Sequence, residues 1–245
     1  MSAPAAVARR RAVRQFVPPQ HGAWAMLLLP YLAGVLAAGF RWPDLPLLGA
    51  WLSGYLLSYF ALQAVKTRRP QRFREPLFWY APITAALSLA VVVARPRVLL
   101  FAPVFAVLLA VNAWYAARRR DRALVNDLAL VVQSCLMVFV VAVVAGQPPG
   151  RVLTPFLVVL LYFAGTVLYV KTMIRERGSR AYRRASMAFH LFALVVAAAL
   201  GPVPAVVFAL LLARAWLAPG RGLTPKQVGL AEIVASALVL IAAVV

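Results

Sequence analysis

Acidic residues, cysteine and histidine are all scarce in this chain of 245 residues. Six Asp and Glu residues stand against 26 Lys and Arg, and there are one Cys and two His. The single Cys135 excludes an internal disulfide framework, and no third ligand stands at a metal-site spacing from the two His. The sequence therefore predicts no metal site and no cofactor.

Soluble-enzyme signatures are also absent. The chain contains no Gly-x-Gly-x-x-Gly, no phosphate-binding loop and no Gly-x-Ser-x-Gly. Only 13% of its residues are charged, against about 25% in soluble domains. The net charge of +20 does not indicate a nucleic-acid partner, because the cations are confined to short loops between apolar runs.

Long apolar runs fill the remainder, and 64% of the residues are hydrophobic. Since a membrane helix needs about 20 mostly apolar residues, we predict an all-α, polytopic integral membrane bundle of about nine transmembrane helices. Residues 1–19 would form a basic cytoplasmic tail, and residues 20–245 a single transmembrane helical domain. The predicted spans are Ala23–Phe40, Leu45–Val65, Leu77–Ala94, Val98–Ala117, Leu124–Gly146, Val152–Ile174, Ser186–Leu200, Val203–Leu217 and Val228–Val245.

The cations alternate between loops. The N-terminal tail and every second loop hold 22 of the 26 Lys and Arg, and the other loops hold only Arg41, Arg95, Arg97 and Arg151. Lys and Arg accumulate in cytoplasmic loops of membrane proteins. We therefore predict a protein of the cytoplasmic membrane whose N-terminus is cytoplasmic and whose C-terminus is outside.

Polar residues inside the spans gather at the predicted cytoplasmic depth. Such residues are costly in a bilayer and mark candidate sites, so we predict a cytoplasm-facing cavity lined with Tyr and amides and rimmed with Arg. Structural roles compete with this interpretation: loop cations set topology, Asp127 pairs with a neighbouring Arg, and Glu232 pairs with Arg214. The intramembrane set is His21, Gln63, Asn112, Asn126, Asp127, Lys171, His190, Arg214 and Glu232.

Two segments carry a resemblance to a known family. Pro19–Met26 reads PQHGAWAM, and Lys171–Arg177 reads KTMIRER. With these segments the chain resembles the YwiC-like family of bacterial membrane proteins over most of its length. That resemblance implies a multi-pass membrane protein and no particular activity.

A more distant resemblance is to the UbiA superfamily of intramembrane prenyltransferases. The second and sixth spans end in the matched tripeptides Val65-Lys66-Thr67 and Val170-Lys171-Thr172, and Arg118–Leu128 forms a basic segment before the fifth span. The resemblance implies a UbiA-like bundle of nine helices with a cytoplasm-facing cavity. It also implies magnesium-binding Asp-rich motifs at the ends of the second and sixth spans, where this chain has cations. Magnesium needs oxygen ligands, whereas Arg binds phosphate or carboxylate directly.

We therefore hypothesise that the protein binds an anionic amphipathic ligand, which is isoprenoid or lipid-like. Its other expected partner is the lipid bilayer in which it lies. The residues favour binding over catalysis; any chemistry would be prenyl or lipid-head-group transfer without the metal motifs. A small organic-anion transporter and a membrane scaffold subunit are the alternatives. The predicted ligand-binding residues are Tyr59, Gln63, Lys66, Asn112, Arg118, Arg119, Asn126, Asp127, Lys171, Arg175 and Arg177, and the candidate catalytic groups are Asp127 and His21.

Overall fold

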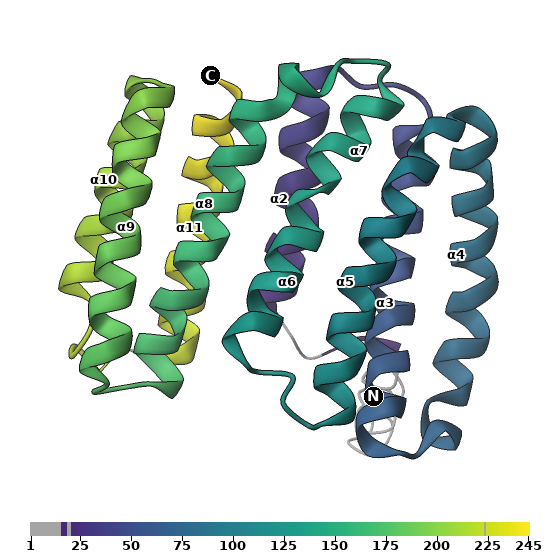
Figure 1. Ribbon diagram of the computed structural model, residues 1–245, viewed down its shortest axis with the longest axis horizontal. Helices are drawn as coiled ribbons and strands as arrows, with labels where there is room; N and C mark the ends of the chain where they lie inside the picture. Colours follow the sequence, from purple (N-terminus) through teal and green to yellow (C-terminus); the bar gives the residue numbers. More distant parts are fainter. Residues whose placement is uncertain (1–15, 19–20, 223) are drawn as a thin grey trace, which may run out of the picture. The chain divides into compact units, whose positions relative to one another are not determined.

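A computed structural model describes residues 16–18, 21–222 and 224–245, without the side chains of His21, Gly22, Pro225 and Lys226. Within these ranges the chain forms helices and no strands (Figure 1). The predicted tail of residues 1–19 lies outside the described residues except for residues 16–18.

The predicted helices are present. The elements are α2 (His21–Ala38), α3 (Asp44–Thr67), η1 (Pro70–Phe73), α4 (Arg74–Ala94), η2 (Pro96–Phe101), α5 (Ala102–Ala117), α6 (Leu124–Cys135), α7 (Met137–Val144), η3 (Pro149–Val152), α8 (Leu153–Val170), η4 (Lys171–Arg175), α9 (Arg180–Leu200), α10 (Pro202–Leu217) and α11 (Pro225–Val244).

Length and hydropathy confirm a polytopic membrane bundle. Seven helical segments in the described part of the chain are long and apolar enough to cross a membrane, and α2 and α10 are shorter apolar helices. The turn predicted at Gly201-Pro202 is also present: Gly201 ends α9 with φ of 151°, and Pro202 opens α10. These nine apolar segments correspond to the nine predicted spans.

Two of the predicted spans differ most from the structure. The fifth span is divided at Leu136 into α6 and α7. The seventh begins at Arg180 rather than Ser186, because the Ser179 side chain accepts a hydrogen bond from the Tyr182 backbone N–H and caps the helix. The charged first turns of α9 hid this start from a search for apolar residues.

The chain divides into two compact units. Unit 1 comprises residues 1–21 and 41–126, and unit 2 comprises residues 22–40 and 127–245. In unit 1, α3 packs against both α4 and α5. In unit 2, α8 packs against α9 and α11, and α10 packs against α9 and α11 (Figure 1). The single domain predicted over residues 20–245 stays a prediction.

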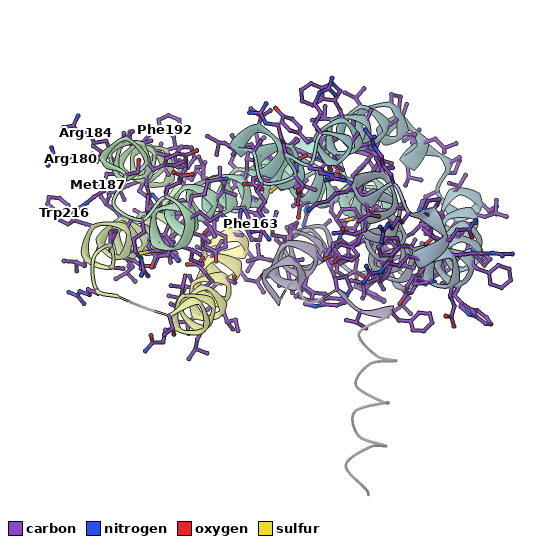
Figure 2. All side chains as sticks on the ribbon, turned by 90° about the horizontal axis from the view of Figure 1, so that it is seen from below. Phe163, Arg180, Arg184, Met187, Phe192 and Trp216 are labelled. Carbon is purple, nitrogen blue, oxygen red and sulfur yellow. The ribbon has the colours of Figure 1, made fainter. Side chains whose placement is uncertain are left out.

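Buried alanine, valine, leucine and aromatic side chains form most of the main core of unit 2. Phe163 of α8 and Phe208 of α10 are almost fully buried in it, whereas Trp216 is exposed. In Figure 2, Trp216, Arg180 and Arg184 project outward from the edge formed by α9 and α10. This edge therefore presents cations and an aromatic ring together.

Proline within α2 is accommodated by a neighbouring helix. Pro30 has no N–H, so the carbonyl of Met26 four residues earlier loses its helical partner. The Ser134 hydroxyl of α6 donates a hydrogen bond to this carbonyl. Such compensation is what allows proline inside membrane helices, and it fixes α6 against α2.

A π-helical turn ends α8. Over Lys171–Arg175 the backbone adopts the wider turn, and the Glu176 N–H donates to the Lys171 carbonyl at 2.7 Å. A π-turn inserts one residue and rotates the side chains that follow, and such turns are frequent at functional sites. The sequence pattern predicted only a continuous helix here.

Candidate functional site

In unit 1, four polar side chains gather where α3, α5 and the start of α6 meet. Lys66 Nζ of α3 lies 2.9 Å from both carboxylate oxygens of Asp121. Asn126 donates to the Asp121 carbonyl at 2.7 Å, and Asn112 of α5 donates to the Asn126 side-chain oxygen at 3.1 Å. Lys66, Asn112 and Asn126 were predicted ligand-binding residues, and they are joined through an acid that the prediction omitted.

The Asp121 carboxyl has a lowered pKa. Burial alone would raise it, but the hydrogen bond and positive charge of Lys66 outweigh that effect, and Arg122 adds to them. Asp121 is therefore an ionised counter-charge for Lys66. A lysine held in this way has less capacity to bind a ligand anion than a free one.

The two arginines predicted to bind a ligand in this unit lie at the surface. Arg118 is exposed and places its guanidinium 3.8 Å from the centre of the Trp114 ring. Arg119 is exposed and adopts a left-handed backbone with φ of 57°. Tyr59 and Gln63 are half-buried on α3, where the Tyr59 ring contacts those of Tyr55 and Phe60.

In unit 2, the second matched lysine also pairs with an acid. Lys171 Nζ lies 2.7 Å from Asp127 Oδ2, and the two side chains are 7% and 22% exposed. Asp127 lies in the first turn of α6, where the helix dipole favours negative charge. The sequence suggested Arg118, Arg119 or Arg122 as its partner; the structure gives Lys171.

A cavity of about 350 Å³ adjoins the π-turn in unit 2. Arg177, Arg180 and Arg183 line it together with Glu176 and the N-cap residue Ser179. The remaining wall comes from Thr172, Met173, Gly178, Pro219, Gly220 and Gly222.

Of the predicted ligand-binding residues, only Arg177 lines this cavity. Arg175 is exposed at the end of the π-turn. Arg180 and Arg183 are not among the predicted ligand-binding residues. Their i, i+3 spacing behind a Ser-x-x-Tyr cap was the available signal.

A buried polar network lies deeper in unit 2. Arg214 of α10 forms an ion pair with Glu232 of α11, as one structural interpretation of the sequence predicted. Tyr162 and Thr166 of α8 each donate to Glu232 Oε2 at 3.1 Å. The Arg214 guanidinium carbon lies 4.2 Å from the centre of the Tyr169 ring. This face of α8 therefore points into the unit.

The remaining site predictions concern His21 and metals. The His21 side chain lies outside the described residues, so its candidate catalytic role stays a prediction. Among the side chains that the structure describes, no group of three His, Cys, Asp or Glu could hold a metal ion. The predicted absence of a cofactor remains untested.

These helices and this distribution of polar groups define a polytopic α-helical membrane protein with basic connecting segments. A family model described as YwiC-like protein matches residues 17–142. The chain belongs to the YwiC-like family.

Two relatives match nearly the whole chain. The uncharacterized protein YwiC of Bacillus subtilis (strain 168) is 32% identical over 224 residues, which are 91% of this chain and 94% of that protein. An uncharacterized protein of Haemophilus influenzae (strain ATCC 51907 / DSM 11121 / KW20 / Rd) is 29% identical over 233 residues, which are 92% of this chain and 96% of that protein. No solved structure matches. The resemblance to the UbiA superfamily stays a prediction.

Proposed function

We propose that the protein binds the phosphate head group of an amphipathic ligand, lipid or isoprenoid, in the cavity beside the π-turn of unit 2. The observation that carries this proposal is that Arg177, Arg180 and Arg183 all line one cavity of about 350 Å³. Arginine binds phosphate through two parallel N–H bonds and suits this role better than lysine.

The local backbone supports the same ligand. Ser179 caps α9, a helix of 21 residues whose start lines the cavity, so the positive end of the helix dipole lies beside the three arginines. Glu176 supplies one negative charge on the cavity wall. The balance of charge remains positive, as an anionic head group requires.

Position at a helix end supports an amphipathic ligand rather than a soluble one. The cavity adjoins the ends of α8 and α10, both apolar helices, and Met173 and Pro219 contribute apolar wall. An acyl or isoprenoid tail could follow the apolar helix surfaces while the phosphate stays among the arginines.

The two matched lysines take a different role in this proposal. Lys66 and Lys171 each lie within 3 Å of an aspartate oxygen, so their charge is already balanced locally. We assign them and their acids to holding α3 and α8 in place. Arg177 then remains as the ligand-binding residue of the KTMIRER segment, because it lines the cavity.

Native mass spectrometry of the detergent-purified protein tests the proposal. Phosphatidylglycerol and farnesyl phosphate serve as separate probes, because they present phosphate on a lipid and on an isoprenoid. The triple substitution Arg177→Gln, Arg180→Gln and Arg183→Gln should abolish binding of whichever probe the unmodified protein retains. Retention by the triple variant would refute the cavity as the site.

A matched control removes the same charge elsewhere. Arg69, Arg72 and Arg74 are exposed cations in and beside η1 in unit 1. Replacing all three with Gln should leave probe binding unchanged. Equal loss in both triple variants would indicate a general effect of charge on anionic lipid, and would contradict a specific site.

We also propose the orientation with a cytoplasmic N-terminus and an external C-terminus in the cytoplasmic membrane. The unequal distribution of cations between alternate loops supports it. In this orientation the arginine cavity faces the cytoplasm. Cysteine labelling of intact cells tests this topology: Val245→Cys should react with an impermeant maleimide, and Arg184→Cys should react only after lysis, with Cys135 replaced by Ala in both.

A further inference from the structure

The Glu232 carboxylate is fully engaged inside unit 2. Arg214 Nη1 donates to Oε1, and the Tyr162 and Thr166 hydroxyls donate to Oε2 at 3.1 Å. Tyr162 also lies 2.9 Å from the Ser236 hydroxyl. Every oxygen of this carboxylate therefore has a donor, supplied by α8 and α10.

Arg214, the cationic partner of Glu232, makes its hydrogen bond to that residue through only one of its guanidinium nitrogens. Arg214 Nε and Nη2 are buried, and neither has a hydrogen-bond partner among the described residues. These two nitrogens form one edge of the planar guanidinium. Leaving buried donors without acceptors is unfavourable, because they have lost their hydrogen bonds to water. The described residues thus leave one edge of the Arg214 guanidinium without a hydrogen-bond acceptor.

The geometry of this edge selects a class of ligand. Two parallel N–H groups match the two coplanar oxygens of a carboxylate. The net charge of the ligand matters as well. Arg214 already balances Glu232, so a dianion would add two uncompensated charges within the spans. A monocarboxylate is the anion that this edge fits best.

One added charge would still be costly in an apolar span, and a proton removes it. We propose that Arg214 and Glu232 form a proton-linked site for a monocarboxylate, which occupies the Nε–Nη2 edge of Arg214 while Glu232 takes up one proton. The proton comes from the aqueous phase and ends on the Glu232 carboxylate, so the occupied site keeps the net charge of the empty one.

The groups around the pair are compatible with this exchange. From α8 it faces Tyr162 and Tyr169, and His190 of α9 lies within electrostatic range of Arg214. His190 Nδ1 donates to the Ser186 carbonyl at 2.7 Å. Glu232 is the proton acceptor, because it pairs with the same guanidinium that the ligand carboxylate would bind. The hydroxyls around it can accept a hydrogen bond from the protonated acid as well as donate one.

Met173 and Tyr169 lie between the Arg214–Glu232 pair and the cavity. Met173 lines the cavity and packs in one apolar cluster with Tyr169, whose ring covers the Arg214 guanidinium. Methionine is flexible and adapts its shape easily. The site is separate from the phosphate site and does not depend on it.

Calorimetry with sodium octanoate tests the proposal on the full-length protein in detergent at pH 7. Titrations in two buffers of different ionisation enthalpy give the number of protons taken up for each octanoate bound. We expect saturable binding with one proton taken up. No binding at millimolar octanoate, or binding without proton uptake, would overturn the proposal.

Two variants assign the roles. Arg214→Lys keeps the charge but loses the two-donor edge, and should weaken octanoate binding at least about tenfold. Glu232→Gln resembles the protonated acid, and should keep octanoate binding but lose proton uptake. Unchanged affinity in Arg214→Lys, or proton uptake persisting in Glu232→Gln, would contradict the assignment.

Controls separate folding and the phosphate site from these results. Arg184→Lys makes the same change at an exposed position and should bind octanoate normally. Thermal unfolding shows whether each variant is folded. If Arg214→Lys does not fold, the proton count of the unmodified protein and of Glu232→Gln still decides the question. Loss of phosphate-probe binding in the triple arginine variant leaves this outcome unaffected.

Discussion

Lys171 is held by Asp127 more closely and in a more buried position than Lys66 is held by Asp121. The first pair lies at 2.7 Å with side chains 7% and 22% exposed, and the second at 2.9 Å with side chains 30% and 34% exposed. Both lysines belong to the same tripeptide, Val-Lys-Thr, at the end of an apolar helix. The lysine of the same tripeptide therefore lies in two different electrostatic environments, one more buried than the other.

Because the two ion pairs differ in burial, removing the aspartate of each pair should change the free energy of unfolding by different amounts. Asp127→Asn deprives a buried ammonium of its carboxylate and should lower the free energy of unfolding by about 3 kcal/mol. Asp121→Asn removes a solvent-screened pair and should cost much less. Reversible unfolding in mixed micelles measures both, and an equal cost would contradict the burial argument.

A second change distinguishes the ion pair from local packing around it. Lys171→Met in the Asp127→Asn background removes the buried charge, and should recover most of the lost unfolding free energy. Lys66→Met in the Asp121→Asn background is the matched control in unit 1. No recovery in the first double variant would show that the charge pair is not the cause.

The lowered pKa of Asp121 predicts a pH dependence. A carboxyl whose pKa is lower in the folded protein stabilises the fold above its ordinary value of 3.8. That stabilisation is lost as the pH falls through the folded pKa. The difference in stability between the unmodified protein and Asp121→Asn should therefore be full at pH 7 and shrink below pH 4 or so. A constant difference down to pH 2 would be inconsistent with this coupling.

The hydrogen bond from Ser134 to the Met26 carbonyl predicts a rescue. Ser134→Ala should cost about 1–2 kcal/mol, because it leaves a partly buried carbonyl without this donor. In a Pro30→Ala background the restored N–H can bond the same carbonyl, so Ser134→Ala should cost less there. A double-mutant cycle of unfolding free energies measures the coupling, and additive costs would argue against compensation.

Two helical glycines should respond oppositely to alanine. A Cβ on Gly34 of α2 would lie 2.9 Å from Val141 Cβ, so Gly34→Ala should destabilise unit 2. A Cβ on Gly54 of α3 would meet Thr84 Cγ2 at 3.6 Å, an ordinary contact. Gly54→Ala should be neutral or stabilising by up to about 1 kcal/mol, since alanine favours helix. Thermal unfolding compares the two variants directly.

Helix positions could be predicted from the sequence because a bilayer requires long apolar runs, and this requirement is local. Leu77–Ala94 was predicted and Arg74–Ala94 is observed. The start of α9 at Arg180 could not be found in this way, since its first turns are cationic. Capping by Ser179 was the local signal that hydropathy ignores.

Side-chain partners were harder to predict, because they depend on which helices meet. The predicted set included Lys66 and Asn126 but not Asp121, which accepts hydrogen bonds from both. In the sequence Asp121 is a single acid among arginines, and any of them could have been its partner. The π-turn at Lys171–Arg175 has no simple sequence signature, and it determines which side chains reach the cavity.

The short segment from Asp121 to Asp127 carries a counter-ion for each of the two Val-Lys-Thr lysines. Loss of Lys66 therefore removes the need for an acid at position 121, and loss of Lys171 removes the need for one at position 127. Among homologues, position 66 should covary with position 121 and position 171 with position 127, with little crossing between the two pairs.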